Sequence, residues 1–238
     1  MKPVTQIFQN QHILYDVDNF RHDYMQAFEL SYWQRLGQVS TPQGGRGDAW
    51  IINAGDEQYV YRHYRRGGLV AHFTPDKYLG MNVVESRMWR EWKLLAWMFE
   101  QGLPVPQPVA ARVIKNGMIY SGDILTRFIP NTQTLVNCLQ QGSCENLDWL
   151  ALGKLLRRFH QTGVEHADLN AHNILIDTQG HLFLIDFDRS QQRDAGHWQQ
   201  RNLARLLRSL KKESAGQGFA FHESDWQRLI KGYDQYQN

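Results

Sequence analysis

The sequence predicts an α+β protein of two lobes: an antiparallel-sheet lobe with one main helix, then a mostly helical lobe that carries a small hairpin. Three observations predict this. Short runs rich in β-branched and aromatic residues dominate the first half of the chain. Apolar residues at helical spacing dominate after Pro130. The 238 residues, 42% of them hydrophobic, suffice for one sizeable core or two small ones. The predicted lobes are 1–129 and 130–238, with a hinge near 127–134.

The first predicted elements are two strands joined as a hairpin. The strand-like runs cover 49–52 and 58–64, and the Asn-Ala-Gly-Asp sequence at 53–56 is typical of a turn. A helix is predicted over 83–101, where large apolar residues recur at helical spacing. A glycine and three closely spaced prolines follow it, and they end the helix.

A second hairpin completes the strands of the first lobe. Short strands at 113–114 and 119–120 flank the turn 115–117, and a last strand over 124–129 ends at Pro130.

The second lobe is predicted to contain three main helices and one buried hairpin. The helices cover 147–160, 198–212 and 224–236. The hairpin consists of the apolar runs 173–176 and 182–185, joined by a turn.

Composition excludes several classes of protein. The net charge of +2 argues against a dedicated nucleic-acid binder. The longest apolar run, Leu94–Phe99, is far too short to cross a membrane, and the N-terminus lacks the apolar region of a signal peptide. Cys138 and Cys144 are interpreted as ordinary thiols in a reducing compartment. We therefore expect a soluble cytoplasmic protein, which leaves room for binding at a membrane surface.

The densest cluster of polar residues, His166–Asn173, lies between a predicted helix and the buried hairpin. Asp186 follows at the end of the second strand of that hairpin, so these side chains are expected at one edge of it. Phosphoryl transfer from Mg-ATP needs such groups: the Asp168 carboxylate to accept the proton of an attacking hydroxyl, and Asn173 with Asp186 to hold Mg²⁺ against the phosphates. The alternative is that these residues only cap a turn and end a strand, which explains their types but not their joint spacing.

These residues resemble the catalytic motifs of the protein kinase superfamily. The matches are H-x-D-L-x-x-x-N, with Asp168 and Asn173, and D-F-x, with Asp186. The resemblance implies a bilobal protein-kinase-like fold that uses ATP and Mg²⁺, and His166 is expected to orient the catalytic loop. Asp188 replaces the glycine of D-F-G, so the turn lacks the conformational freedom of that glycine.

The first lobe matches these motifs less closely. Gly44, Gly45 and Gly47 stand where a phosphate-covering loop belongs, but their spacing departs from G-x-G-x-x-G, and an ordinary glycine turn is an alternative.

Arg62 takes the position of the usual phosphate-binding lysine, and a solvated cation at a strand edge is the alternative reading. Its ionic partner is expected on the following helix, with Glu91 preferred over Glu85.

The length of the second lobe narrows the substrate class. Only 52 residues follow Asp186, and they contain no A-P-E segment, which favours a small-molecule or lipid-sugar kinase over a regulated protein kinase. Residues 91–110 are similar to the aminoglycoside and choline phosphotransferases.

Three strings carry a closer resemblance: YRHYRRGG at 61–68, HADLNAHN at 166–173 and IDFDRS at 185–190. With most of the chain from Gly44 to Lys212, they resemble the 3-deoxy-D-manno-octulosonic acid (Kdo) kinase family of Gram-negative bacteria. The resemblance implies that ATP phosphorylates the 4-hydroxyl of Kdo on a lipid A precursor, at the cytoplasmic face of the inner membrane, in lipopolysaccharide core biosynthesis. No protein partner and no nucleic acid are predicted.

Two basic regions suit such a substrate. Arg65 and Arg66, beside Arg62, form a run that ends in two glycines, where a Kdo carboxylate or a lipid A phosphate would suit the guanidinium groups. Over 198–212, Arg and Lys side chains gather on one helical face, which could rest on anionic lipid. In both regions the alternative is a solvated surface, and it is the commoner case.

Two other functions remain open. An aminoglycoside-type phosphotransferase would keep Asp168, Asn173 and Asp186 but give no meaning to the run from Arg62 to Gly68. A pseudokinase binding module is suggested by Arg62 and the irregular glycine loop, whereas the intact acidic motifs argue against it.

Overall fold

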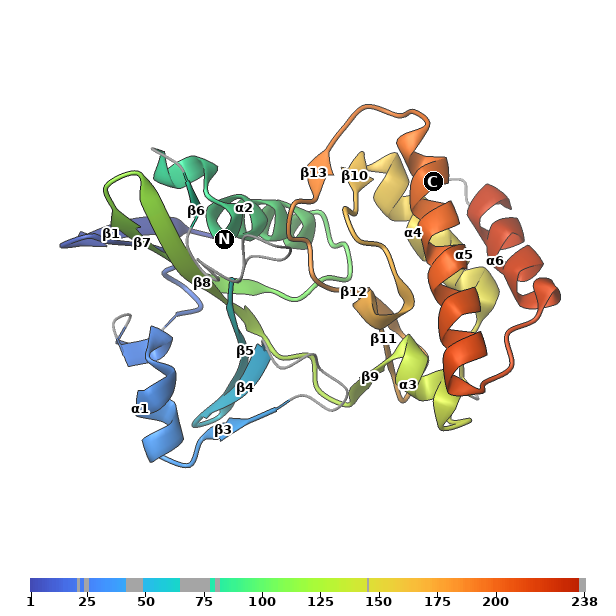
Figure 1. The fold of residues 1–238 in the computed structure, drawn as a ribbon, viewed down its shortest axis with the longest axis horizontal. Helices are drawn as coiled ribbons and strands as arrows, with labels where there is room; N and C mark the ends of the chain where they lie inside the picture. Colours follow the sequence, from blue (N-terminus) through green and yellow to red (C-terminus); the bar gives the residue numbers. More distant parts are fainter. Residues whose placement is uncertain are drawn as a thin grey trace. The chain divides into compact units, whose positions relative to one another are not determined.

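The computed structural model describes residues 1–20, 22–23, 26–41, 49–64, 78–79, 82–144 and 146–235 (Figure 1). The chain forms two compact units. The first contains residues 1–100 and 106–128, and the second contains residues 101–105 and 129–238.

The first unit is built on one eight-stranded antiparallel sheet with the order β1-β2-β7-β8-β5-β4-β3, in which β6 also pairs with β8. Its strands are β1 (Pro3–Phe8), β2 (Gln11–Asp16), β3 (Val39–Ser40), β4 (Ala49–Ala54), β5 (Glu57–His63), β6 (Tyr78–Leu79), β7 (Pro108–Asn116) and β8 (Ile119–Arg127). The predicted β4–β5 hairpin is confirmed, and Gly55 at its turn has a φ of +68°, which a residue without Cβ adopts at no steric cost.

β8 is one continuous strand, where the sequence predicts two separate pieces. The apolar pattern is interrupted at Gly122. Only glycine fits there, because a Cβ would lie 2.1 Å from the carbonyl oxygen of Arg112 on the neighbouring strand. The glycine therefore permits close strand packing and does not mark a turn.

The first 40 residues contain elements that the sequence does not predict. β1 is almost wholly exposed, so it lacks the apolar alternation that identifies a strand. The helix α1 (Leu30–Arg35), after the short 3₁₀ helix η1 (Gln26–Phe28), has only six residues, too few for a helical period to emerge. β1 is defined by its backbone pairing with β2, and α1 by its packing against strand residues.

The sheet of the first unit is covered on both faces at its strand β7. β7 is buried at every residue from Pro108 to Val113, whereas a strand with one open face would alternate. The helix α2 (Arg87–Glu100) contacts β7, and the short 3₁₀ helix η3 (Val83–Glu85) precedes it. A separate cluster around Phe28, Trp33 and Tyr59 packs η1 and α1 against strand residues.

The second unit contains helices and three small groups of strands. Its helices are α3 (Leu135–Gln140), α4 (Trp149–Gln161), the 3₁₀ helix η4 (Ala171–Asn173), α5 (Trp198–Gln217) and α6 (Glu223–Gln235). Its strands are β9 (Thr132–Thr134), β10 (Val164–Glu165), β11 (Ile174–Asp177), β12 (Leu182–Leu184) and β13 (Gln191–Gln192). β9, β11 and β12 form one antiparallel sheet, and β10 pairs with β13.

The three long helices lie side by side (Figure 1). Gly153 of α4 and Gly232 of α6 allow these two helices to approach closely. A Cβ on Gly153 would lie 1.9 Å from the Leu229 carbonyl oxygen, and one on Gly232 would lie 2.0 Å from that of Leu150. Within the described part of the chain, every helix is too short or too polar to traverse a bilayer.

Residues 101–105 belong to the second unit although they follow α2 in the chain. The Leu184 N–H of β12 donates to the Pro104 carbonyl at 3.0 Å, and the Arg158 guanidinium donates to the Gly102 carbonyl at 2.8 Å. The segment thus extends the edge of the β11–β12 hairpin.

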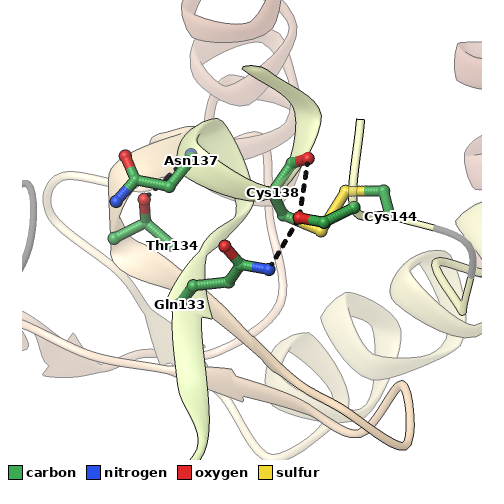
Figure 2. Close-up of a disulfide and its surroundings, with 6 residues drawn as sticks. Gln133, Thr134, Asn137, Cys138 and Cys144 are labelled. Atoms are coloured by element: carbon green, nitrogen blue, oxygen red, sulfur yellow. Dashed lines mark hydrogen bonds between the residues drawn. A yellow bond between two sulfur atoms is a disulfide. The ribbon is translucent and has the colours of Figure 1, made fainter. Parts of the chain in front are cut away.

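The prediction of two free thiols is wrong for this structure, because Cys138 and Cys144 form a disulfide (Figure 2). After α3, Gly142 adopts a φ of +61° and the Ser143 N–H donates to the Cys138 carbonyl at 3.1 Å. This turn brings the two Cα atoms to 5.2 Å, within the range that a disulfide spans. The prediction used the number of cysteines and missed the turn that brings them together.

Candidate active site

The polar loop His166–Asn173 lies in the second unit, between β10 and β11, and ends in η4. Asn170 organises it. Its Oδ1 accepts hydrogen bonds from the backbone N–H groups of His172 (2.9 Å) and Asn173 (3.2 Å), as a cap does at the start of a 3₁₀ helix. Asn170 was not predicted as a site residue, although an asparagine immediately before a helical turn is a recognisable cap.

His166 connects the loop to the end of β12. Its Nε2 donates to the Ile185 carbonyl at 3.0 Å, and its Nδ1 accepts from the Asp168 N–H at 3.1 Å. Each ring nitrogen has one role, as in a neutral imidazole. Burial lowers the pKa of His166 below its usual value, which favours the same neutral form. These two hydrogen bonds tie the loop to the end of β12. That His166 orients a catalytic loop stays a prediction.

Asn173 is held so that one end of its amide stays available. Its Nδ2 donates to the Asp168 carbonyl at 2.9 Å, while among the described residues its Oδ1 accepts no hydrogen bond. An amide oxygen presented in this way suits a hard cation such as Mg²⁺.

Asp186 follows the strand that pairs with β11. Ile174 lies opposite Leu184, and the Ile185 N–H donates to the Asn173 carbonyl at 3.0 Å. Asp186 is therefore one residue beyond the partner of Asn173, at the same end of the hairpin. An amide oxygen and a carboxylate at one hairpin end fit the hard donor set of Mg²⁺. In the described ranges, no three His, Cys, Asp or Glu side chains gather as a metal site.

The residues after Asp186 anchor the turn. Phe187 is fully buried, with its ring 4.7 Å from that of His166 and 6.0 Å from that of Phe159. The Ser190 hydroxyl accepts from the Ala167 N–H at 3.0 Å, a second link to the polar loop.

The left-handed residues of this turn are Asp186 (φ +62°) and Arg189 (φ +61°). Asp188 has no positive φ, so this turn does not require the missing glycine at that position. Aspartate is among the non-glycine residues that adopt this conformation most readily.

Asp168 forms an ion pair that the sequence analysis did not predict. The guanidinium of Arg205, on α5, donates to Oδ1 of Asp168 from both Nε (2.8 Å) and Nη2. Both residues are about half exposed.

Four residues of α5, at spacings of three, four and four, contact the polar loop. Asn202 accepts from the His166 N–H (3.1 Å) and donates to the His166 carbonyl (3.0 Å). The other three are Arg205 against Asp168, Ser209 against the Ala171 N–H (3.1 Å) and Glu213 against His172 (3.3 Å). These spacings place the four on one face of a helix. The spacing of these polar residues in the sequence could have predicted a polar helix face. It could not have predicted which loop that face contacts.

The predicted basic face on 198–212 is therefore divided. Arg205 turns to the loop, whereas Arg201, Arg208 and Lys212 are exposed. Whether this exposed part contacts lipid stays a prediction.

In the first unit, the ion pair expected for Arg62 is confirmed: its Nη2 donates to both carboxylate oxygens of Glu91 on α2. Tyr64, not predicted, lies two residues along from Arg62 and donates its hydroxyl proton to the same carboxylate. Burial, with the Glu91 charge adding to it, raises the pKa of Tyr64 well above its usual value, so the phenol stays a neutral donor.

Five predicted site residues lie outside the described residues. These are Gly44, Gly45 and Gly47 of the glycine loop, and Arg65 and Arg66 of the basic run. Their roles stay predictions.

A cavity of about 410 Å³ lies elsewhere in the second unit. Its lining includes Asn131, Cys138 and Asp177 and none of the predicted site residues.

Comparison with known proteins places the chain in a family. A model of the lipopolysaccharide kinase (Kdo/WaaP) family matches residues 31–233. A 3-deoxy-D-manno-octulosonic acid kinase of Photobacterium profundum is 37% identical over 227 residues, covering 95% of this chain and 96% of the relative. One of Actinobacillus succinogenes is 38% identical over 227 residues, covering 92% and 95%.

Among solved structures, WaaP in complex with acyl carrier protein has a similar fold. The TM-score is 0.58 at 19% identity, over 91% of this chain and 84% of that chain. The predicted kinase-like α+β fold and the family resemblance are thereby confirmed. With the family model matched over most of its length, the chain belongs to the lipopolysaccharide kinase (Kdo/WaaP) family.

Proposed function

We propose that this chain is an ATP-dependent kinase that phosphorylates the 4-hydroxyl of Kdo on a lipid A precursor, in lipopolysaccharide core biosynthesis. The observation that carries the proposal is the hydrogen-bonded loop that holds Asp168 and Asn173 beside the hairpin end at Asp186. The proposed substrate is supported by the similarity of nearly the whole chain to proteins named as Kdo kinases.

Asp168 is the proposed base. The acceptor hydroxyl oxygen forms a bond to the γ-phosphorus of ATP, and the bond from that phosphorus to the leaving oxygen of ADP breaks. The hydroxyl proton passes to the Asp168 carboxylate, so the products are a phosphate ester and ADP. Among the described residues, Oδ2 of Asp168 accepts no hydrogen bond and is available for this proton.

Asn173 and Asp186 are the proposed Mg²⁺ ligands, through Oδ1 and the carboxylate respectively. Mg²⁺ supplies charge neutralisation on the phosphate oxygens when it is bound. Two protein oxygens with phosphate and water oxygens form the coordination that Mg²⁺ commonly has in phosphoryl-transfer enzymes.

The remaining roles extend the proposal. Arg62, fixed by Glu91, is proposed to bind phosphate oxygens of ATP. Arg65 and Arg66 are proposed to bind an anionic group of the acceptor, and Gly44, Gly45 and Gly47 to cover the phosphates. The protein would act as a peripheral enzyme at the cytoplasmic face of the inner membrane.

Transfer of radiolabel from γ-³²P-ATP tests the proposal. The acceptors are Kdo-bearing lipid A precursor, the same precursor without Kdo, an aminoglycoside and a serine-rich protein. We expect label on the Kdo lipid alone, and none with Asp168→Ala, which should still bind ATP. Label on the aminoglycoside would favour the other phosphotransferase branch, and ATP binding with no transfer would favour a pseudokinase.

The metal ligand is tested by Asp186→Asn. We expect ATP binding by this variant to lose most of its response to added Mg²⁺, because an amide replaces the carboxylate charge. Asp194→Asn, at an exposed loop position, is the control. A Mg²⁺ titration identical to that of the wild type would remove Asp186 from the proposal.

A further inference from the structure

We propose that Arg205 is a positioning residue that sets the orientation of the Asp168 carboxylate. The inference rests on the proposed function, in which Asp168 is the base. It assigns a role in the reaction to α5, which no sequence motif connects to the catalytic loop.

The geometry directs both donors to one oxygen. Nε and Nη2 of Arg205 converge on Oδ1 of Asp168, and among the described residues Oδ2 accepts no hydrogen bond. The planar guanidinium is a rigid fork, so two bonds from it restrict rotation of the carboxylate more than one bond from a flexible amine would. Arg205 thereby holds Oδ1 and leaves Oδ2 for the proton of the acceptor hydroxyl.

The helix that carries Arg205 is itself fixed to the loop on both sides of Asp168. The buried Asn202 makes reciprocal hydrogen bonds with the backbone of His166, and Ser209 accepts from the Ala171 N–H. α5 therefore fixes the loop backbone as well as the carboxylate. An orientation set by a long helix is more precise than one set within a loop.

Folding stability does not account for the pair. Arg205 and Asp168 are 48% and 47% exposed, and ion pairs exposed to this degree add little to stability. We therefore expect the Arg205–Asp168 ion pair to affect the orientation of the Asp168 carboxylate. It also follows that Arg205 can be replaced without unfolding the protein, so the variants can be compared directly.

The test compares Arg205→Gln and Arg205→Lys in the full chain, with label transfer measured at varied ATP and acceptor. We expect kcat of Arg205→Gln to fall about 10- to 100-fold, the range in which misplaced catalytic groups act. KM for both substrates should stay within about twofold, since a residue that acts only through Asp168 binds neither substrate. Arg205→Lys should recover part of kcat, because an ammonium keeps the charge but loses the fork.

The matched control is Arg228→Gln. It removes another exposed Arg–Asp pair, to Asp148, with 61% and 54% exposure and a 3.8 Å separation, and it should leave kcat unchanged. Thermal unfolding of every variant should stay near that of the wild type.

Two outcomes would overturn the role of Arg205. Wild-type kcat in Arg205→Gln would show that Asp168 needs no such support. A raised acceptor KM at normal kcat would make Arg205 a substrate ligand instead. Both differ from failure of the proposed function, in which Asp168→Ala itself retains turnover.

Discussion

Glu91 is the buried member of the Arg62 ion pair, in which the guanidinium balances the charge of its carboxylate. Glu91→Gln leaves Arg62 facing a neutral amide, and breaking one side of a largely buried pair is costly. We expect the free energy of unfolding to fall by about 2 kcal/mol, since Arg62 is partly exposed. Urea unfolding measures this loss.

Tyr64→Phe serves as the comparison for that variant. It removes one hydrogen bond to Glu91 and leaves the ion pair, so its effect on unfolding should be smaller. Equal stability of Glu91→Gln and the wild type would contradict the reading of the pair as a structural support.

At the residue scale, the sequence predicted the groups that belong to a local motif. Asp168, Asn173 and Asp186 were predicted as site residues because their spacing along the chain is itself the signal, and their roles stay predictions. Arg205 was not, because its contact joins residues 37 positions apart and depends on how α5 packs on the loop. Tyr64 was missed for a different reason: a tyrosine next to a strand is common, and its partner lies on another element.

Among the elements, α4 carries a histidine whose burial makes folding depend on pH. Burial lowers the pKa of His160 from its usual 6.5 to about 4, and its Nδ1 is hydrogen-bonded to the Tyr233 hydroxyl of α6. The unfolded chain therefore binds a proton in this pH range that the folded chain does not. The contribution of the neutral His160 to the free energy of unfolding is therefore complete above about pH 6.5, and it is lost as the pH falls toward 4.

We expect this histidine to remove about 2 kcal/mol of stability between pH 7 and pH 5. His160→Gln, which keeps a hydrogen-bonding side chain but cannot titrate, should show a flatter pH dependence in urea unfolding. His197→Gln, at an exposed position, should follow the wild type. If the slopes of wild type and His160→Gln coincide, His160 does not cause the acid sensitivity.

The disulfide after α3 predicts a dependence on redox conditions. Closing a loop of this length restricts the unfolded chain and adds about 2 kcal/mol to stability. Addition of a reductant should lower the free energy of unfolding by that amount. A variant with both cysteines changed to alanine should not respond to reductant, and a wild type equally indifferent to it would contradict the expected contribution.

Elements with a strong local pattern were predicted well. The β4–β5 hairpin, α2, α4, the β11–β12 hairpin, α5 and α6 all form close to the expected residues. β1, α1 and α3 were not predicted, because exposed or very short segments have no clear period. α5 continues to Gln217, beyond the expected Lys212, and Gly218 then ends it with a φ of +75°.

At the scale of the whole molecule, the division into two units can be tested at residues 101–105, which belong to the second unit. The Val105 N–H donates to the Leu103 carbonyl, and both side chains are buried in the second unit. In low denaturant, the Val105 amide should exchange hydrogen at the rate of Leu184 and not at the rate of β7, which follows it in the chain. Exchange of Val105 together with β7 would contradict the assignment.

The position of residues 101–105 also determines how the gene can be divided. The polypeptide passes from one unit to the other three times, at 100/101, 105/106 and 128/129. A single cut at 128/129 would leave Pro104, whose carbonyl pairs with Leu184, on the wrong fragment. Complementation from two fragments cut there therefore requires the first fragment to supply residues 101–105 to the second unit, whereas a cut at 100/101 would keep 101–105 on the same fragment as 129–238.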